Sequence, residues 1–335
     1  MTKDNTNKIN NLNVLYFIVI LLLIIGHCIQ TGSGEAYDNF GNVLFKAIYA
    51  FHVPLFTMIF GYLLYDDTTK HEEKEVAKKS FNTFIMPLIG YSLLELLWEL
   101  LEKTLTIHNI PVIAKTFIQL LLETQWFIRG MFILTIIVLI IKKYFKDSIY
   151  IYLLILILTL FLPSDHGLSL YGFTYPYFVI GYLANKEKLI SKIKNPKWVC
   201  LISTVLYFAL LTQYNKDCYI YTTGLNVLNS PNQIWIDIYR FIIGLLGCIS
   251  VVSFVKVLNV KKLHPIVETI SNNWFQIYLV SNVLFRFLDK ITSKLSGLNI
   301  LLLLIEIIVM IVLSLIIIKI CKKNKILSRM LLGIW

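Results

Sequence analysis

The sequence predicts an all-α polytopic membrane protein, a bundle of about ten transmembrane helices with both termini in the cytoplasm. Of its 335 residues, 57% are hydrophobic and only 15% are charged, and the mean hydropathy is +0.71. Such a chain has more apolar surface than one soluble core could bury, so lipid must solvate it. Apolar runs of about 17 to 25 residues, the length of a spanning helix, recur along the chain, and basic residues concentrate in alternate loops.

Each apolar run predicts one spanning helix. The segment from Pro111 to Glu123 is also apolar, but it could lie in the membrane interface or re-enter rather than cross. The first run is expected to be a permanent helix, since no small-residue cleavage site follows it. The ten predicted spans cover residues 12 to 29, 43 to 65, 81 to 101, 126 to 141, 148 to 162, 168 to 184, 198 to 213, 232 to 258, 263 to 287 and 297 to 318.

The basic residues predict the orientation, because cytoplasmic loops are enriched in Lys and Arg. With the N-terminus inside, most of the 31 basic residues fall in cytoplasmic segments, and Lys46, Arg129 and Arg240 lie within spans. The net charge of +11 then reflects orientation in the membrane and not nucleic-acid binding. We expect one transmembrane domain over residues 12 to 320, with short cytoplasmic tails at 1 to 11 and 321 to 335.

The cysteines, and two similar segments that contain proline and glycine, have structural interpretations. The five cysteines are scattered without the paired spacing of a zinc site or a disulfide framework, so they are expected to be apolar fillers and no metal is predicted. The Pro54 and Gly61-Tyr62-Leu63 segment is echoed by Pro176 and Gly181-Tyr182-Leu183. The unequal gaps between proline and glycine favour a shared packing device over a duplication.

Two histidines within apolar runs are the strongest functional signal. His27 ends the first predicted span at its outer end, and His52 lies roughly 14 Å into the second at about 1.5 Å per residue. An ionisable side chain inside a membrane is costly and usually marks a ligand, proton or reaction path. A histidine in a bundle can also be a hydrogen-bonded core residue. The pair, with Arg129 at a similar predicted depth, favours function and predicts a polar cavity open to the outside.

Other ionisable side chains in the outer half have open alternatives. Arg240 could bind a ligand, or it could simply be neutralised by Asp237 one turn earlier. Glu95 and Glu99 share one helix face and could bind substrate or form a snorkelling interfacial face. A thioester relay at Cys28 is disfavoured, because adjacent helical residues point about 100° apart.

Several segments carry a resemblance to the acyltransferase-3 family of bacterial membrane O-acyltransferases, including the fucose 4-O-acetylase-like and capsule O-acetyltransferase branches. The phenylalanine-histidine-proline segment with its upstream glycine-histidine is the most specific, and the likeness spans about residues 12 to 320. The resembling segments are Leu22 to His27, Ile48 to Phe56 with Gly61 to Leu63, Gln125 to Arg129, Tyr175 to Leu183, and Ile270 to Leu279.

The chain departs from that family pattern at the cytoplasmic end of its first span. Family members commonly have an acid there and a basic residue eleven positions before the histidine, where this chain has Asn13 and Tyr16. Position 16 shares a helix face with His27, roughly 16 Å away. The last motif usually ends in histidine, whereas here Ser281 and Asn282 follow Tyr278 to Val280.

The resemblance implies acetyl transfer from acetyl-CoA to a sugar hydroxyl of a cell-surface polysaccharide or its lipid-linked precursor, in the bacterial cytoplasmic membrane, with no bound cofactor. It implies that His27 is the base, that His52 orients it or donates to the oxyanion, and that Arg129 stabilises the oxyanion. The remaining expected substrate contacts are Arg240, Trp126, Glu95, Glu99, Tyr16 and Asn13.

Two alternatives to an active enzyme remain at this point. A transporter or flippase for a glycan precursor would also use a polar outer cavity between helices. A catalytically degenerate family member is suggested by Asn13 and Tyr16.

Overall fold

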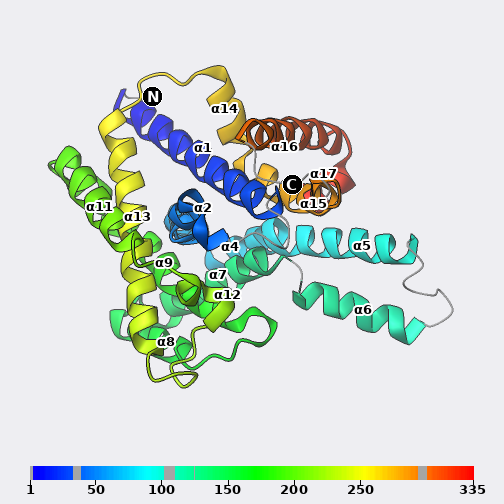
Figure 1. Ribbon diagram of the computed structural model, residues 1–335, viewed down its shortest axis with the longest axis horizontal. Coiled ribbons are helices and arrows are strands. Elements are labelled where there is room, and N and C mark those ends of the chain that lie inside the picture. The colour runs from blue at the N-terminus through cyan, green and yellow to red at the C-terminus, as the bar shows by residue number, and fades with distance from the viewer. Residues whose placement is uncertain (1–2, 33–38, 102–109, 124, 293–299) are drawn as a thin grey trace. The chain divides into compact units, whose positions relative to one another are not determined.

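The computed structural model describes residues 3–32, 39–101, 110–123, 125–292 and 300–335, and these residues form helices without a strand (Figure 1). The predicted all-α class is therefore confirmed. Every predicted span coincides with a helix or with two consecutive helices. Five helical stretches are long and apolar enough to cross a bilayer: Asn10–Gln30, Val43–Lys70, Glu73–Leu101, Gln233–Leu258 and Ile300–Cys321.

Shorter helices account for the other predicted spans. A bent pair, α6 (Ile110–Glu123) and α7 (Trp126–Phe145), meets the same criterion when taken together, with 70° between its halves. Three further apolar stretches, at Ile149–Thr159, Pro196–Leu211 and Trp274–Phe285, are shorter. The chain is a multi-pass membrane protein. The count of ten spans, the orientation and the single-domain boundary stay predictions.

The chain divides into two compact units. The first comprises residues 1–59, 186–223 and 234–319, and the second comprises 60–185, 224–233 and 320–335. The helices that lie wholly or mainly in the first unit are α1 (Lys3–Gly32), α2 (Val43–Tyr49), α10 (Leu189–Lys192), α11 (Pro196–Leu211), α12 (Ile220–Thr223), α13 (Gln233–Leu258), α14 (Pro265–Asn272), α15 (Trp274–Thr292) and α16 (Ile300–Cys321).

In the first unit, α1 packs along α14 and α15 and against α2 (Figure 1). Gly26 permits the approach to α2, because a Cβ there would lie 3.1 Å from both Ile48 and the Tyr49 ring. The side chains of Val19, Ile20 and Ile24 are almost completely buried. The C-terminal part of α1, which carries His27, is therefore fixed against the residues that precede His52.

The predicted second span, 43 to 65, lies within the helical stretch Val43–Lys70, which contains a local break. It breaks at Ala50 and Phe51, between α2 and α3 (His52–Lys70). Pro54 lies in the first turn of α3, where its missing N–H costs nothing. At the break, Tyr207 donates its hydroxyl to the carbonyl oxygen of Ala47, and the carbonyl oxygen of Ile48 accepts from both the Phe51 backbone N–H and the His52 side chain.

The second unit contains most of α3 and a π-helical turn. Pro87 follows the π turn Phe81–Ile85, and its ring would otherwise clash with the carbonyl group four residues earlier, so the wider turn relieves that clash. Helix α5 packs against both α6 and α17. The remaining helices of this unit are α4 (Glu73–Ser80), α5 (Met86–Leu101), α6, α7, α8 (Ile149–Thr159), α9 (Leu168–Lys186) and α17 (Lys325–Leu332).

The two echoed glycine segments meet in this second unit. A Cβ on Gly61 of α3 would lie 2.0 Å from the carbonyl oxygen of Phe178 and 3.1 Å from the backbone nitrogen of Tyr182, both in α9. Helices α3 and α9 therefore cross with their backbones in contact. The interpretation of this segment as a packing device is confirmed for Gly61.

Candidate functional site

His52 lies at the first residue of α3 and is buried, with 3% of its surface exposed. Its Nδ1 lies 3.0 Å from the carbonyl oxygen of Ile48. A carbonyl oxygen can only accept, so Nδ1 carries the hydrogen and donates it. In the neutral ring, Nε2 therefore keeps a free lone pair. The broken second span thus fixes both the orientation and the tautomer of this imidazole.

Tyr49 joins the two histidines. Its ring lies edge-on to the His52 ring at 4.7 Å between centroids and edge-on to the His27 ring at 6.3 Å. Its hydroxyl donates to Oε1 of Gln30 at 2.6 Å. The Gln30 side chain also hydrogen-bonds to His27. The structure therefore brings His27 and His52 together, as predicted, around a tyrosine and a glutamine that sequence reasoning missed.

His27 keeps part of its surface accessible, whereas His52 is buried. The Phe285 ring of α15 lies 5.0 Å from the His27 ring, and the two imidazoles interact electrostatically. His27 is thus the more accessible of the two rings, and His52 lies in the interior. The spacing of Gln30, three residues after His27 on the same helix face, was the signal that could have identified it.

The position of Tyr16 is filled by an aromatic stack. Its ring lies parallel to that of Trp274, with 5.0 Å between centroids and 10° between planes. Trp274 also contacts Phe56, and Phe56 contacts Tyr278. Asn13 is half-buried one turn earlier on α1. The N-terminal portion of the His27 helix face therefore packs through aromatic rings, and the substrate contacts expected of Asn13 and Tyr16 stay predictions.

Glu306 is a buried carboxylate that sequence reasoning missed. It lies on α16 with 7% of its surface exposed, and its Oε1 has no hydrogen-bond partner among the described residues. It interacts electrostatically with Cys28, the neighbour of His27. The signal for it was a lone acid within the most apolar run of the chain.

Arg240 is buried in α13, and its guanidinium is surrounded by protein groups. It forms an ion pair with Asp237 at 2.9 Å and donates to the backbone of the segment that links α11 to α13. Neutralisation by Asp237 was one of its two sequence interpretations. Substrate binding by Arg240 stays a prediction.

Arg129 lies in the second unit, so its predicted proximity to the histidines stays a prediction. Its Nη1 donates to the carbonyl oxygen of Leu121 at 2.6 Å, and its Nε donates to the Tyr171 hydroxyl. The Leu121 carbonyl belongs to the last turn of α6, where carbonyl groups lack helical partners. Arg129 therefore ties the end of α6 to α7 and α9.

The other predicted contacts in the second unit are Trp126, Glu95 and Glu99. Trp126 begins α7, and its ring lies edge-on to that of Phe127. Glu95 and Glu99 both lie on α5, where Glu95 has both carboxylate oxygens buried and Glu99 is half-buried. Their roles in substrate binding stay predictions.

Metal ligation and cysteine chemistry find no support in the described part of the chain. It contains no group of three or more His, Cys, Asp or Glu side chains able to hold a metal ion. None of the five cysteines, all in the described part of the chain, forms a disulfide, and Cys28, Cys248 and Cys321 are buried. Buried and scattered thiols fit the filler interpretation.

The fold and these residues define a multi-pass membrane protein with a coupled imidazole pair, one ring accessible and one buried. The chain belongs to the acyltransferase-3 family, since the family profile, described as "Acyltransferase domain", matches residues 9–319. It is thus a membrane acyltransferase, which confirms the family predicted from the sequence motifs.

Two curated relatives carry the name nodulation protein NolL. The chain is 25% identical over 288 residues to the protein from Mesorhizobium japonicum, which covers 82% of this chain and 76% of the relative. It is 23% identical over 210 residues to the protein from Sinorhizobium fredii, which covers 61% of this chain and 57% of the relative. No solved structure matches the chain.

Proposed function

We propose that this chain is an O-acetyltransferase of the bacterial cytoplasmic membrane that moves an acetyl group from acetyl-CoA to a sugar hydroxyl of a cell-surface polysaccharide or its lipid-linked precursor. The observation that carries the proposal is the His27, Tyr49 and His52 constellation in a chain of the acyltransferase-3 family. Imidazoles are the commonest general bases in proteins. A partly accessible imidazole supported by a buried one suits removal of a hydroxyl proton.

In this mechanism His27 accepts the proton of the sugar hydroxyl as the hydroxyl oxygen attacks the thioester carbonyl carbon. The tetrahedral intermediate collapses with cleavage of the carbon–sulfur bond, and the protonated imidazole returns its proton to the leaving thiolate. Because Nδ1 of His52 already donates to Ile48, its free Nε2 is suited to accept a hydrogen bond. Of the two roles considered for His52, orienting His27 fits this tautomer, whereas a neutral ring could not donate to the oxyanion from Nε2.

The test is incubation of the purified protein in detergent or nanodiscs with labelled acetyl-CoA and a panel of glycan acceptors. Transfer of label to the glycan is expected. Binding of acetyl-CoA without transfer would instead indicate a degenerate member, and neither binding nor transfer would favour a transporter. In cells, deletion of the gene should remove O-acetyl signals from the proton NMR spectrum of the surface glycan.

Tyr49→Phe tests the hydroxyl that bonds to Gln30. The phenyl ring keeps its packing against both histidines, but the hydrogen bond to Oε1 of Gln30 is lost. We expect transfer activity to fall by several fold with little change in thermal stability, since one net hydrogen bond contributes about 1 kcal/mol. Tyr49→Ala should lose far more activity. Equal activity of Tyr49→Phe and the wild type would remove the hydroxyl from the mechanism.

Arg129→Lys separates oxyanion stabilisation from a structural role. Lysine keeps the charge but loses the planar fork that reaches both Leu121 and Tyr171. If Arg129 stabilises the oxyanion, kcat should fall by at least tenfold at a temperature where the variant is fully folded. A lower melting temperature with unchanged kcat would assign Arg129 to the structure of the α6, α7 and α9 region alone.

A further inference from the structure

The segment that links α11 to α13 is shaped by local hydrogen bonds. Asn215 accepts from the backbone N–H groups of Asp217 at 2.9 Å and Cys218 at 3.3 Å, which starts a single 3-10 turn. Helix α12, only four residues long, follows and ends at Thr223. Such short elements contain few internal hydrogen bonds, so this segment depends on other parts of the protein for its conformation.

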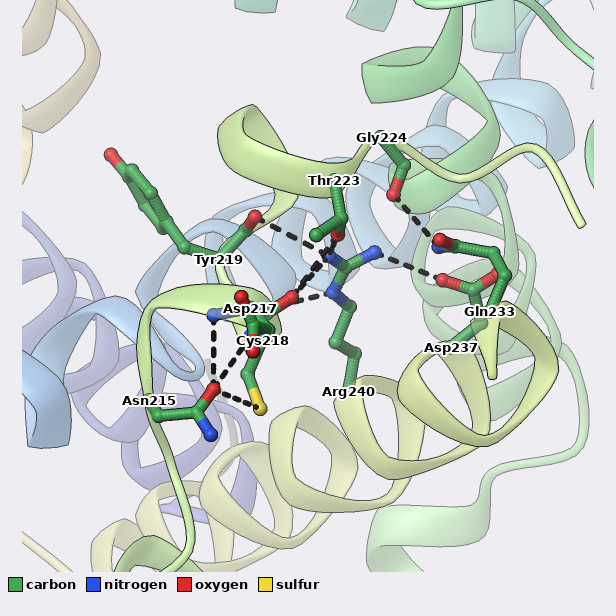
Figure 2. A network of polar contacts seen from close by, with 9 residues as sticks. All are labelled: Asn215, Asp217, Cys218, Tyr219, Thr223, Gly224, Gln233, Asp237 and Arg240. Atoms are coloured by element: carbon green, nitrogen blue, oxygen red, sulfur yellow. Dashed lines mark hydrogen bonds and ion pairs between the residues drawn. The ribbon is translucent and has the colours of Figure 1, made fainter. Parts of the chain in front are cut away.

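Arg240 supplies the missing contacts, as Figure 2 shows. Its Nε donates to the carbonyl oxygen of Cys218 at 2.8 Å, and its Nη2 donates to the carbonyl oxygens of Asp217 at 3.0 Å and Tyr219 at 3.3 Å. Nη2 also donates to the Thr223 hydroxyl. One side chain thus binds four residues of the segment, and Asp237 balances its charge.

This arrangement depends on the guanidinium group. Three carbonyl oxygens and a hydroxyl accept from two nitrogens of the planar guanidinium group, and the third nitrogen binds Asp237. The ammonium of lysine is a compact point charge with a single nitrogen and three donors. Arg240 is 3% exposed, so its contacts are formed away from competing water. Because loss of one partner leaves buried polar groups unsatisfied, the network is expected to be sensitive to single substitutions.

The 215–223 segment places Tyr219 against Tyr49, the ring that joins the two histidines. The Tyr219 ring lies 5.8 Å from the Tyr49 ring in an edge-on contact and also contacts Phe45 and Phe40. Tyr49 in turn contacts both imidazoles. A continuous series of contacts therefore leads from the Arg240 guanidinium through the backbone at Tyr219 to the ring that joins His27 and His52.

We propose that Arg240 is a positioning residue: it fixes the 215–223 segment so that Tyr219 holds Tyr49 against the histidine pair. This inference rests on the proposed acetyl transfer. The sequence predicts a direct substrate contact for Arg240. The proposal instead gives Arg240 an indirect effect on the reaction that acts through Tyr219. It predicts that Arg240 sets the rate of transfer and not the affinity for the sugar or the acyl donor.

The kinetic test uses Arg240→Lys, Tyr219→Ala and the double variant in the full-length protein. Each single variant should lower kcat at least tenfold and leave KM for acetyl-CoA and acceptor within about twofold. Because both act through the same ring, the double variant should be no slower than the worse single variant. Arg329→Lys, an exposed arginine on α17 that lies over Trp335, is the matched control and should keep wild-type kinetics.

Hydrogen–deuterium exchange gives a readout that does not need activity. Arg240→Lys should speed exchange in residues 215–223 and also in residues 43–52, while α14 and α15 stay protected. If Arg240→Lys does not fold, Thr223→Val removes one of the contacts and should produce the same pattern more weakly. This readout stands even if no acetyl transfer is found, so the failure of the proposed function can be distinguished from the failure of the positioning role.

Three results would overturn the proposal. A raised KM with unchanged kcat and unchanged exchange would make Arg240 a substrate contact. Multiplied losses in the double variant would show that Arg240 and Tyr219 act independently. Faster exchange limited to residues 215–223, with no change at residues 43–52, would show that Arg240 does not act on the histidine pair through this segment.

Discussion

Replacing His27 with alanine is expected to reduce acetyl transfer by roughly 10²- to 10⁴-fold, the usual contribution of a general base. The protein should still fold and insert, because His27 is partly accessible at the end of α1 and its loss leaves no large internal cavity. Transfer of label from acetyl-CoA, measured on purified protein of verified monodispersity, gives the rate.

His52→Ala is expected to lose activity to a similar degree for a different reason. It removes the ring that donates to Ile48 and contacts Tyr49 beside His27. His71→Ala is the matched control, since the His71 imidazole is exposed and pairs with Glu75 on the neighbouring turn. Full activity in either His27→Ala or His52→Ala would exclude that residue from the reaction.

Gly61→Ala is expected to cause a large loss of stability. Its Cβ would lie 2.0 Å from the carbonyl oxygen and 2.9 Å from the carbonyl carbon of Phe178. Both are backbone atoms, so α3 and α9 would have to separate, and overpacking of this kind costs about 1–3 kcal/mol or more. Thermal unfolding followed by fluorescence-detected size exclusion should show a melting temperature lower by several degrees.

Gly130→Ala is the comparison for that result. Its Cβ would lie 2.9 Å from the Tyr171 ring, a side-chain neighbour and not a backbone carbonyl group, so the loss of stability should be smaller. A Gly61→Ala protein that melts at the wild-type temperature would show that α3 and α9 do not cross as closely as described.

Most helices could be predicted from the sequence, because spanning length and hydropathy identify them with little reference to tertiary contacts. The break before His52 has its sequence signal in Pro54, whose ring would clash with the carbonyl group of Ala50 four residues earlier in a continuous helix. The tertiary contacts that accompany the break, from Tyr207 to Ala47 and from Phe51 to Gly247 of α13, have no such signal. A Cβ on Gly247 would lie 2.4 Å from the Phe51 ring.

The site could be predicted in part, for a similar reason. His27 and His52 stand out because charges and imidazoles are rare in apolar runs. Tyr49, Tyr219 and Gln30 do not stand out, because tyrosines are common in this chain, which has 19 of them, and only the fold selects these two. Arg240 was identified as a residue of interest, but its partners are backbone carbonyl oxygens, which no side-chain pattern reveals.

The stack of Tyr16 on Trp274 has a consequence for how the protein reaches the membrane. A charged residue in a spanning helix raises the free energy of insertion, most strongly near the helix centre, and the stretch Asn10–Gln30 contains no Asp, Glu, Lys or Arg. With tyrosine and asparagine in place of a cation and an acid, the first helix can enter the bilayer before the helices that later pack on it have been synthesised. Its aromatic partner on α15 then joins a segment that is already in place.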